Sequence, residues 1–156
     1  MAPEPWNPEA ARRTILSSSG AEGALLPILH ALQRQFGCVP DAAVPLVAEA
    51  LNLSRADVHG VVTFYHDFRR VSAGERVVKL CQAEACQARG GRATTAAAEA
   101  RAGIKLGQTT ADGRLTLEPV YCLGLCASGP AALVDGRPVG RLDPVKAGEL
   151  VEGARP

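Results

Sequence analysis

The sequence lacks a net charge of either sign that could attract a highly charged partner. Its 17 lysines and arginines and 16 aspartates and glutamates leave a formal charge of +1 at pH 7 over 156 residues. The basic residues are scattered, with no run longer than the pairs Arg12-Arg13 and Arg69-Arg70. Binding to nucleic acid or to an anionic membrane surface depends on clustered positive charge. We therefore expect neither.

The sequence also lacks an apolar run that could cross a bilayer, which takes about 20 residues. Residues 1–13 hold three prolines and no apolar stretch, so they cannot supply the hydrophobic region of a signal peptide. We expect a soluble, cytoplasmic protein without membrane insertion. Cysteines in that reducing compartment indicate metal or redox chemistry rather than structural disulfides, and this chain has five.

Catalytic motifs are absent as well. The sequence has no nucleophile elbow, no phosphate-binding loop and no dinucleotide-binding glycine pattern. Gly90-Gly91 lacks the lysine of a phosphate loop, and Cys81 and Cys86 are separated by four residues rather than by the two of a thiol oxidoreductase. We predict no catalytic residue in the chain by itself.

The first half of the sequence has a helical pattern. Residues 1–20, which end in Ser-Ser-Ser-Gly, are typical of a flexible or partner-docked tail. Residues 21–72 carry apolar side chains at spacings of three and four residues, which predicts a helical subdomain. Gly37 suits the end of one helix, and Ser54 with Asp57 resembles a capping box at the start of another.

Extended segments alternate with helices in the second half. Residues 77–80 and 115–121 are rich in β-formers, the alanine-rich residues 93–102 favour a helix, and Asp135-Gly136 indicates a hairpin turn. The predicted order, β-α-β-β-β-α, makes residues 73–156 a thioredoxin-like layer of sheet and helices. The expected fold class is α+β, an N-terminal helical bundle followed by a thioredoxin-like α/β domain.

Four of the five cysteines form two pairs, and each pair follows directly on a predicted strand. The pairs are Cys81-x4-Cys86 and Cys122-x3-Cys126, with 35 residues between them. If the two strands are neighbours, both pairs emerge at the same end of the sheet and can surround one small group. Two ferric ions, two sulfides and four thiolates make a [2Fe–2S] cluster of charge −2, which one added electron turns into −3.

The residues around the cysteines suit such a negatively charged cluster. Gly124 and Gly129 let the backbone turn tightly and approach sulfur without a Cβ atom in the way. Leu123 and Leu125 could keep water off the cluster, and Arg89 could offset part of its charge.

Two other interpretations of the cysteines stay open on spacing alone. Structural zinc also takes four cysteines, usually in tighter C-x2-C pairs, and would make the chain a zinc-stapled structural module without redox activity. A thiol–disulfide enzyme would show turnover by the isolated chain.

The fifth cysteine and the histidines show no ligand pattern. Cys38 has no paired partner, so we expect it to be a small apolar residue of the structure. His30, His59 and His66 lack ligand spacing among themselves, and the paired His and Cys motifs of a Rieske-type site are missing. We expect all three histidines to be solvated or core residues.

The segments 36–40 and 58–65, followed by the two cysteine pairs, resemble the thioredoxin-like [2Fe–2S] ferredoxin family over residues 22–152. That family includes the 24-kDa subunit of respiratory complex I, its bacterial equivalents, and small diaphorase subunits of NAD-linked hydrogenases and formate dehydrogenases. The resemblance implies that the cluster ligands are Cys81, Cys86, Cys122 and Cys126. The family often has an aromatic residue in place of Cys38, which argues further against a ligand role for Cys38.

Within the family, residues 81–90 and 121–127 look most like the γ subunit of soluble, molybdenum-containing NAD-dependent formate dehydrogenases. This resemblance implies two partners. One is an NAD-binding flavoprotein subunit that carries FMN and a [4Fe–4S] cluster, and the N-terminal helices help to contact it. The other is a larger catalytic subunit that contains molybdenum and iron–sulfur clusters. The cluster would exchange single electrons with the flavin while the assembly oxidises formate to CO2 and reduces NAD+. The equivalent subunit of NADH:quinone oxidoreductase or of a hydrogenase diaphorase is the alternative.

Overall fold

The computed structural model describes residues 3–152. Their packing divides them into two compact units, with the boundary between Ser72 and Ala73. Each unit has a hydrophobic core of its own. No helix within the described residues combines the length and the apolar character that crossing a membrane requires.

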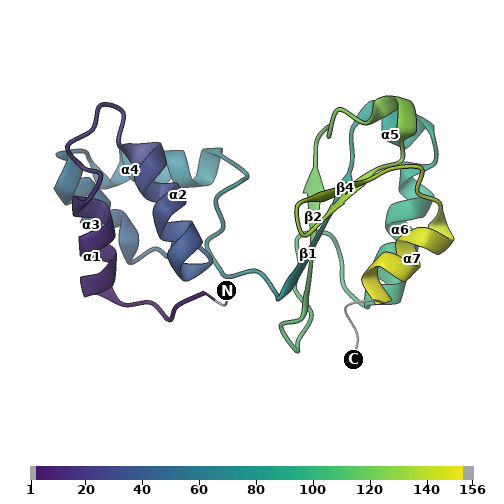
Figure 1. Cartoon of the computed structure of the whole chain (residues 1–156), viewed down its shortest axis with the longest axis horizontal. Coiled ribbons are helices and arrows are strands. Elements are labelled where there is room, and N and C mark those ends of the chain that lie inside the picture. Colours follow the sequence, from purple (N-terminus) through teal and green to yellow (C-terminus); the bar gives the residue numbers. More distant parts are fainter. Residues whose placement is uncertain (1–2, 153–156) are drawn as a thin grey trace. The chain divides into compact units, whose positions relative to one another are not determined.

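Helices packed around one apolar core make up the first unit within residues 3–72 (Figure 1): α1 (Pro8–Leu16), α2 (Leu25–Phe36), α3 (Ala43–Leu51) and α4 (Arg55–Phe64). The apolar residues of α2, spaced three and four residues apart, lie on one face of the helix. This face is buried, and Ile28, Leu29 and Leu32 on it are fully enclosed. Burying a side chain of this size contributes about 1.5–3 kcal/mol relative to leaving it in water.

Two helix boundaries follow from the residues placed there. Gly37 follows α2 with a φ of 76°, and a Cβ atom at this position would lie 2.9 Å from Ser72 Oγ. At the start of α4, Ser54 Oγ accepts a hydrogen bond from the Asp57 N–H at 3.0 Å, while the Ser54 N–H donates to the Asp57 carboxylate at 3.1 Å. The predicted capping box is therefore confirmed.

A flexible or partner-docked tail was expected over residues 1–20, of which residues 1 and 2 lie outside the described part of the chain. The described part of this segment contains helix α1. The Asn7 side chain caps this helix by accepting backbone N–H groups of its first turn. Ala10, Ala11 and Ile15 are buried in the core of the first unit. Two of these three inward residues are alanines, so the helix carries little of the large apolar periodicity by which a sequence reveals a buried face.

The second unit is built on a mixed sheet with the strand order β2-β1-β3-β4. Its strands are β1 (Arg76–Cys81), β2 (Leu115–Val120), β3 (Ala132–Val134) and β4 (Arg137–Val139). β1 and β2 are parallel, whereas β3 is antiparallel to both β1 and β4. The predicted hairpin is confirmed, because Asp135 and Gly136 both have positive φ and connect β3 to β4.

Helices complete the second unit within residues 73–152: α5 (Glu84–Ala88), α6 (Gly91–Ala102), the short 3-10 helix η1 (Cys126–Ser128) and α7 (Pro144–Glu152). α6 and α7 pack against each other and cover one face of the sheet, where Ala98, Ala147 and Val151 join its buried side (Figure 1). The α+β class and the predicted order of strands are confirmed, while α5 is an addition that the sequence pattern did not predict.

Candidate iron–sulfur centre

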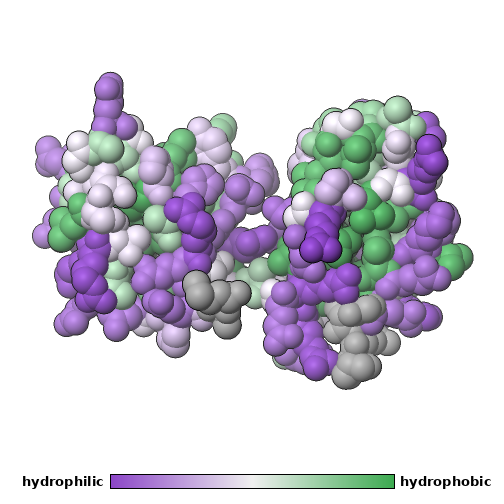
Figure 2. Space-filling view, viewed as in Figure 1, coloured by the Kyte–Doolittle hydropathy of each residue, from purple (hydrophilic) through white to green (hydrophobic). Residues whose placement is uncertain are grey.

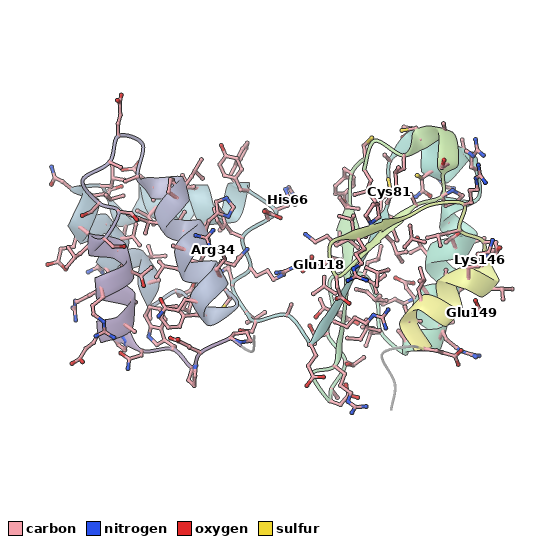
Figure 3. The ribbon with its side chains drawn as sticks, viewed as in Figure 1. Arg34, His66, Cys81, Glu118, Lys146 and Glu149 are labelled. Carbon is pink, nitrogen blue, oxygen red and sulfur yellow. The ribbon has the colours of Figure 1, made fainter. Side chains whose placement is uncertain are left out.

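The strands that precede the two cysteine pairs are parallel neighbours. Arg76 pairs with Leu115 at one end, and Cys81 pairs with Val120 at the other. Cys81 is the last residue of β1, and Cys122 follows the end of β2 by two residues. Both cysteine loops therefore leave the same end of the sheet, where Figure 3 labels Cys81.

The thiols of the four cysteines form one group made of two pairs. Cys122 Sγ and Cys126 Sγ lie 3.7 Å apart. The thiols of Cys81 and Cys86 shift each other's pKa, and the charge of Cys126 also raises the pKa of Cys86, so these sulfurs are near neighbours. All of these cysteines are free thiols. The structure thus brings together the four cysteines that the sequence singles out.

The spacing of these sulfurs fits a cluster that contains two metal ions. Two thiolates bound to one tetrahedral metal at about 2.3 Å are about 3.8 Å apart, close to the separation of Cys122 Sγ and Cys126 Sγ. A [2Fe–2S] cluster bound by four cysteines takes one such pair for each iron. The paired donor set fits a two-iron cluster.

The two pairs differ in their exposure to solvent. Cys81 and Cys86 are buried, at 5% and 2% exposure, whereas Cys122 and Cys126 are exposed. Apolar side chains, among them Leu123 and Leu125, pack around the buried pair. In Figure 2 apolar surface gathers over this end of the second unit. The inner pair is shielded from water, and the outer pair reaches the surface.

Backbone N–H groups from both loops converge on the sulfur of Cys81. Burial raises the pKa of Cys81, but hydrogen bonds from the backbone of Ala83, Cys122 and Leu123 and from the Cys86 thiol outweigh it. The resulting pKa lies below the ordinary value of a cysteine. This environment favours the thiolate, the form of cysteine that binds metal.

The neighbouring sulfurs have the opposite tendency. Burial raises the pKa of Cys86, and the hydrogen bond and charge of Cys81 raise it further, although the Ala131 N–H donates to this sulfur. The hydrogen bond with Cys122 and its charge raise the pKa of Cys126. Thiolates held this close repel one another, so four together need positive charge among them. Two ferric ions supply such charge.

The backbone of the second loop is wound tightly to reach these sulfurs. Cys122 and Gly124 have φ of 75° and 74°, and the Gly124 N–H lies 3.4 Å from Cys122 Sγ. For a residue with a side chain, such as Cys122, this left-handed conformation costs about 1–3 kcal/mol. A Cβ atom on Gly129 would lie 3.1 Å from Cys86 Sγ. The expected close approach of backbone to sulfur agrees with the geometry of Gly129, whereas a Cβ atom on Gly124 would meet nothing within 4 Å and only its positive φ fits the expected tight turn.

Cys38 and the three histidines belong to the first unit. Cys38 is buried, and the Ser72 hydroxyl lies 3.7 Å from its sulfur. The ring of His30 lies 4.8 Å from that of Phe68. His59 and His66 are exposed.

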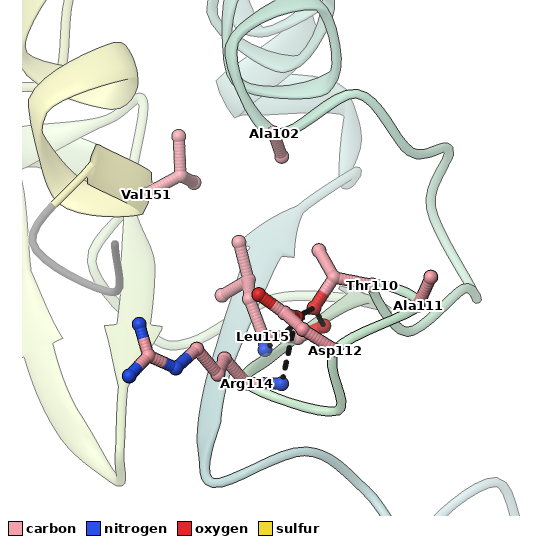
Figure 4. A pocket seen from close by; sticks show the side chains of 7 residues that line it. All are labelled: Ala102, Thr110, Ala111, Asp112, Arg114, Leu115 and Val151. Atoms are coloured by element: carbon pink, nitrogen blue, oxygen red, sulfur yellow. Dashed lines mark hydrogen bonds between the residues drawn. The ribbon is translucent and has the colours of Figure 1, made fainter. Parts of the chain in front are cut away.

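A pocket of about 280 Å³ lies at the other end of the second unit, beside the start of β2 (Figure 4). Its lining includes Asp112, whose pKa is lowered by a hydrogen bond from the Thr110 hydroxyl and by the Arg114 N–H. These hydrogen bonds hold the turn before β2. No cysteine or histidine lines the pocket, so it is separate from the thiol group.

Comparison with known proteins gives a consistent result. The model of the thioredoxin-like [2Fe–2S] ferredoxin family matches residues 11–155. A subunit of the NADH-quinone oxidoreductase of Pseudomonas aeruginosa is 39% identical over 129 residues, which are 83% of this chain and 78% of the relative. HndA, a subunit of the NADP-reducing hydrogenase of Solidesulfovibrio fructosivorans, is 32% identical over 123 residues, 79% of this chain and 72% of the relative.

A solved structure shows the same likeness in three dimensions. The crystal structure of an NAD+-reducing [NiFe]-hydrogenase in the air-oxidized state matches with a TM-score of 0.70 at 28% identity. The match covers 84% of this chain but only 22% of the hydrogenase chain, so this chain spans about a fifth of that longer polypeptide. Because the family match extends over most of the sequence, the chain belongs to the thioredoxin-like [2Fe–2S] ferredoxin family, whose cofactor is a [2Fe–2S] cluster.

Proposed function

We propose that the chain is the [2Fe–2S] electron-transfer subunit of an NAD-linked oxidoreductase complex. The observation that carries this proposal is the gathering of four thiols, in two pairs, at one end of the sheet in a member of this family. We propose Cys81, Cys86, Cys122 and Cys126 as the ligands, with Cys38 outside the set. Zinc stapling is the alternative from a different class.

The residues of the chain would set the environment of the cluster. When bound, a [2Fe–2S] cluster takes up one electron and gives it back. The backbone N–H groups that converge on Cys81 would stabilise the negative charge on sulfur. Leu123 and Leu125 would exclude water from the buried pair. The exposed Cys122 and Cys126 lie on the side that a redox partner can approach.

We propose that this partner is an NAD-binding flavoprotein with FMN and a [4Fe–4S] cluster. Two observations support it. Both named relatives are subunits, of an NADH-quinone oxidoreductase and of an NADP-reducing hydrogenase. The first unit also exposes large apolar side chains, Phe64 at 73% and Tyr65 at 45%, and such surface is typical of a docking site.

We propose, more specifically, which complex the subunit belongs to. The loop sequences 81–90 and 121–127 favour an NAD-dependent formate dehydrogenase, in which a molybdenum and iron–sulfur subunit would be the second partner. The identity to the NADH-quinone oxidoreductase relative supports the alternative parent complex about as well. We further propose a cytoplasmic location, because a reducing compartment keeps cysteines as thiols that can bind metal.

The cluster itself is tested by anaerobic purification of the chain. We expect about two irons and two acid-labile sulfides per chain, since four thiolates bind one [2Fe–2S] cluster. The chain should be EPR-silent as isolated and show a rhombic S = 1/2 signal after dithionite. A colourless chain with stoichiometric zinc and no EPR signal would instead establish the zinc-stapled module.

The partners are tested by purifying a tagged chain anaerobically from its own cells. A flavoprotein with bound FMN should accompany it. Molybdenum and formate-dependent reduction of NAD+ in the same preparation would support the formate dehydrogenase assignment. NADH:quinone or hydrogen:NAD+ activity without molybdenum would support the alternative, and a preparation without any flavin would contradict the proposed partner.

Replacing a proposed ligand should separate cluster binding from ordinary packing. Cys81→Ser should lose the EPR signal and most of the iron and should unfold at a lower denaturant concentration, because metal–ligand bonds contribute to folding. Cys38→Ala is the matched control. It removes a buried sulfur elsewhere and should keep full iron content at a cost of about 1 kcal/mol in the free energy of unfolding. Loss of the cluster in Cys38→Ala would overturn the ligand set.

Gly129→Ala should disturb the cluster without changing any ligand. The added methyl group would press on Cys86 Sγ, and overpacking of this kind costs about 1–3 kcal/mol. We expect a lower iron content per chain and a changed visible absorption spectrum. Gly148→Ala is the control, because its methyl group would make only an ordinary contact at 3.8 Å with Arg101. Equal iron content in both variants would show that the backbone near Cys86 is not closely fitted.

A further inference from the structure

The side chain of Arg89 joins the two cysteine loops, which are distant in sequence. Its Nε donates a hydrogen bond to the carbonyl oxygen of Gly129 at 3.0 Å, across 40 residues of chain. Arg89 directly follows α5 and is three residues after Cys86. Residues at that spacing on a helical turn lie on the same side of it. Arg89 and Cys86 can therefore reach the same segment of the second loop.

The segment of the second loop that Arg89 and Cys86 both reach is residues 129–131. Two residues of this segment, Gly129 and Ala131, lie beside the Cys86 sulfur. The Gly129 backbone is so near Cys86 Sγ that an added Cβ atom would lie 3.1 Å from the sulfur. The Ala131 N–H donates to the same sulfur. The Arg89 hydrogen bond to Gly129 is a third link between α5 and this segment. The position of the segment, and with it the fit around Cys86, depends on these links together.

The carbonyl groups on either side of Gly129 accept hydrogen bonds from backbone N–H groups of another segment. The Ser128 carbonyl accepts the Arg141 N–H, and the Pro130 carbonyl accepts the Leu142 N–H. These bonds tie the second loop to the chain that follows β4. The bond to the Gly129 carbonyl differs, because it comes from a side chain of the first cysteine loop. A substitution at position 89 can remove it without altering the backbone.

Arg89 also places a permanent positive charge three residues after Cys86, on the side chain that hydrogen-bonds to the second cysteine loop. A guanidinium stays charged at every pH that a folded protein survives. The charge of a [2Fe–2S] cluster on four thiolates becomes more negative on reduction, so a nearby cation stabilises the reduced form more than the oxidised form. Loss of the charge should therefore make the cluster harder to reduce.

We propose that Arg89 is a positioning residue of the cluster site. Its hydrogen bond to the Gly129 carbonyl holds the second cysteine loop against α5, and its charge raises the reduction potential. The inference rests on the proposed function, because it assumes a [2Fe–2S] cluster on the four cysteines.

The test compares three variants of the full-length chain with wild type. Arg89→Met removes both the hydrogen bond and the charge, and Arg89→Lys keeps the charge. Arg92→Gln, an exposed arginine on α6, is the control that makes the same change in net charge. The readouts are the rate of iron release to a chelator under anaerobic conditions and the reduction potential from an EPR-monitored titration. Far-UV circular dichroism checks that each variant is folded.

Arg89→Met should release iron roughly three- to tenfold faster than wild type, the factor given by a net hydrogen-bond contribution of about 0.7–1.4 kcal/mol. Its reduction potential should be lower, whereas Arg89→Lys should retain the wild-type potential. Arg92→Gln should match wild type in both readouts. A wild-type release rate in Arg89→Met would overturn the positioning role. A potential shift of equal size in Arg92→Gln would overturn the electrostatic role.

The same experiment distinguishes failure of this inference from failure of the proposed function. If wild type holds no iron and sulfide, the proposed function fails before any variant is compared. If wild type holds the cluster and Arg89→Met behaves as wild type does, only the role of Arg89 is wrong.

Discussion

The parallel pairing of β1 with β2 determines where the four thiols can lie, because it brings the ends of both strands to one edge of the sheet. Parallel neighbours cannot be joined by a tight turn and need a crossover of a dozen or more residues, usually with a helix. Residues 82–114 supply that crossover through α5 and α6. The long gap between the cysteine pairs is therefore a consequence of the sheet topology, and each pair can stay local to its own loop.

Gathering four thiols in this way creates an electrostatic cost, which the fold only partly offsets. Hydrogen bonds lower the pKa of Cys81 against the effect of its burial, while the pKa values of Cys86 and Cys126 are raised by their neighbours. Repulsion between thiolates would favour separating the two loops. Positive charge placed among the sulfurs reverses that preference, so binding of the cluster and closure of the loops should stabilise each other. The hydrogen bond between Arg89 and Gly129 acts in the same direction.

The sequence predicted those features that depend on residue type. Apolar spacing predicted α2, and the pairing of Ser54 with Asp57 predicted the start of α4. The two cysteine pairs indicated the candidate site. The burial of helix α1 in the core was not predicted, because its buried face is mostly alanine. The donors to the sulfurs could not be foreseen either, since they are backbone N–H groups, which nearly every residue carries. The direction in which these N–H groups point depends on the loop conformation, including the positive φ of Cys122. A cysteine in the sequence does not indicate a positive φ.

The unequal exposure of the two cysteine pairs reconciles two requirements of an electron carrier. A cluster open to water on all sides would lose the low-dielectric surroundings and fixed N–H dipoles that tune its potential. A cluster enclosed on all sides would exchange electrons with a partner only over a longer distance, which slows the transfer. Here α5, β1 and the half-buried leucines enclose Cys81 and Cys86, while Cys122 and Cys126 stay at the surface. The buried side of the site is thus separate from the side that can meet a partner. That separation follows from placing the first pair at a strand–helix junction and the second in an exposed loop.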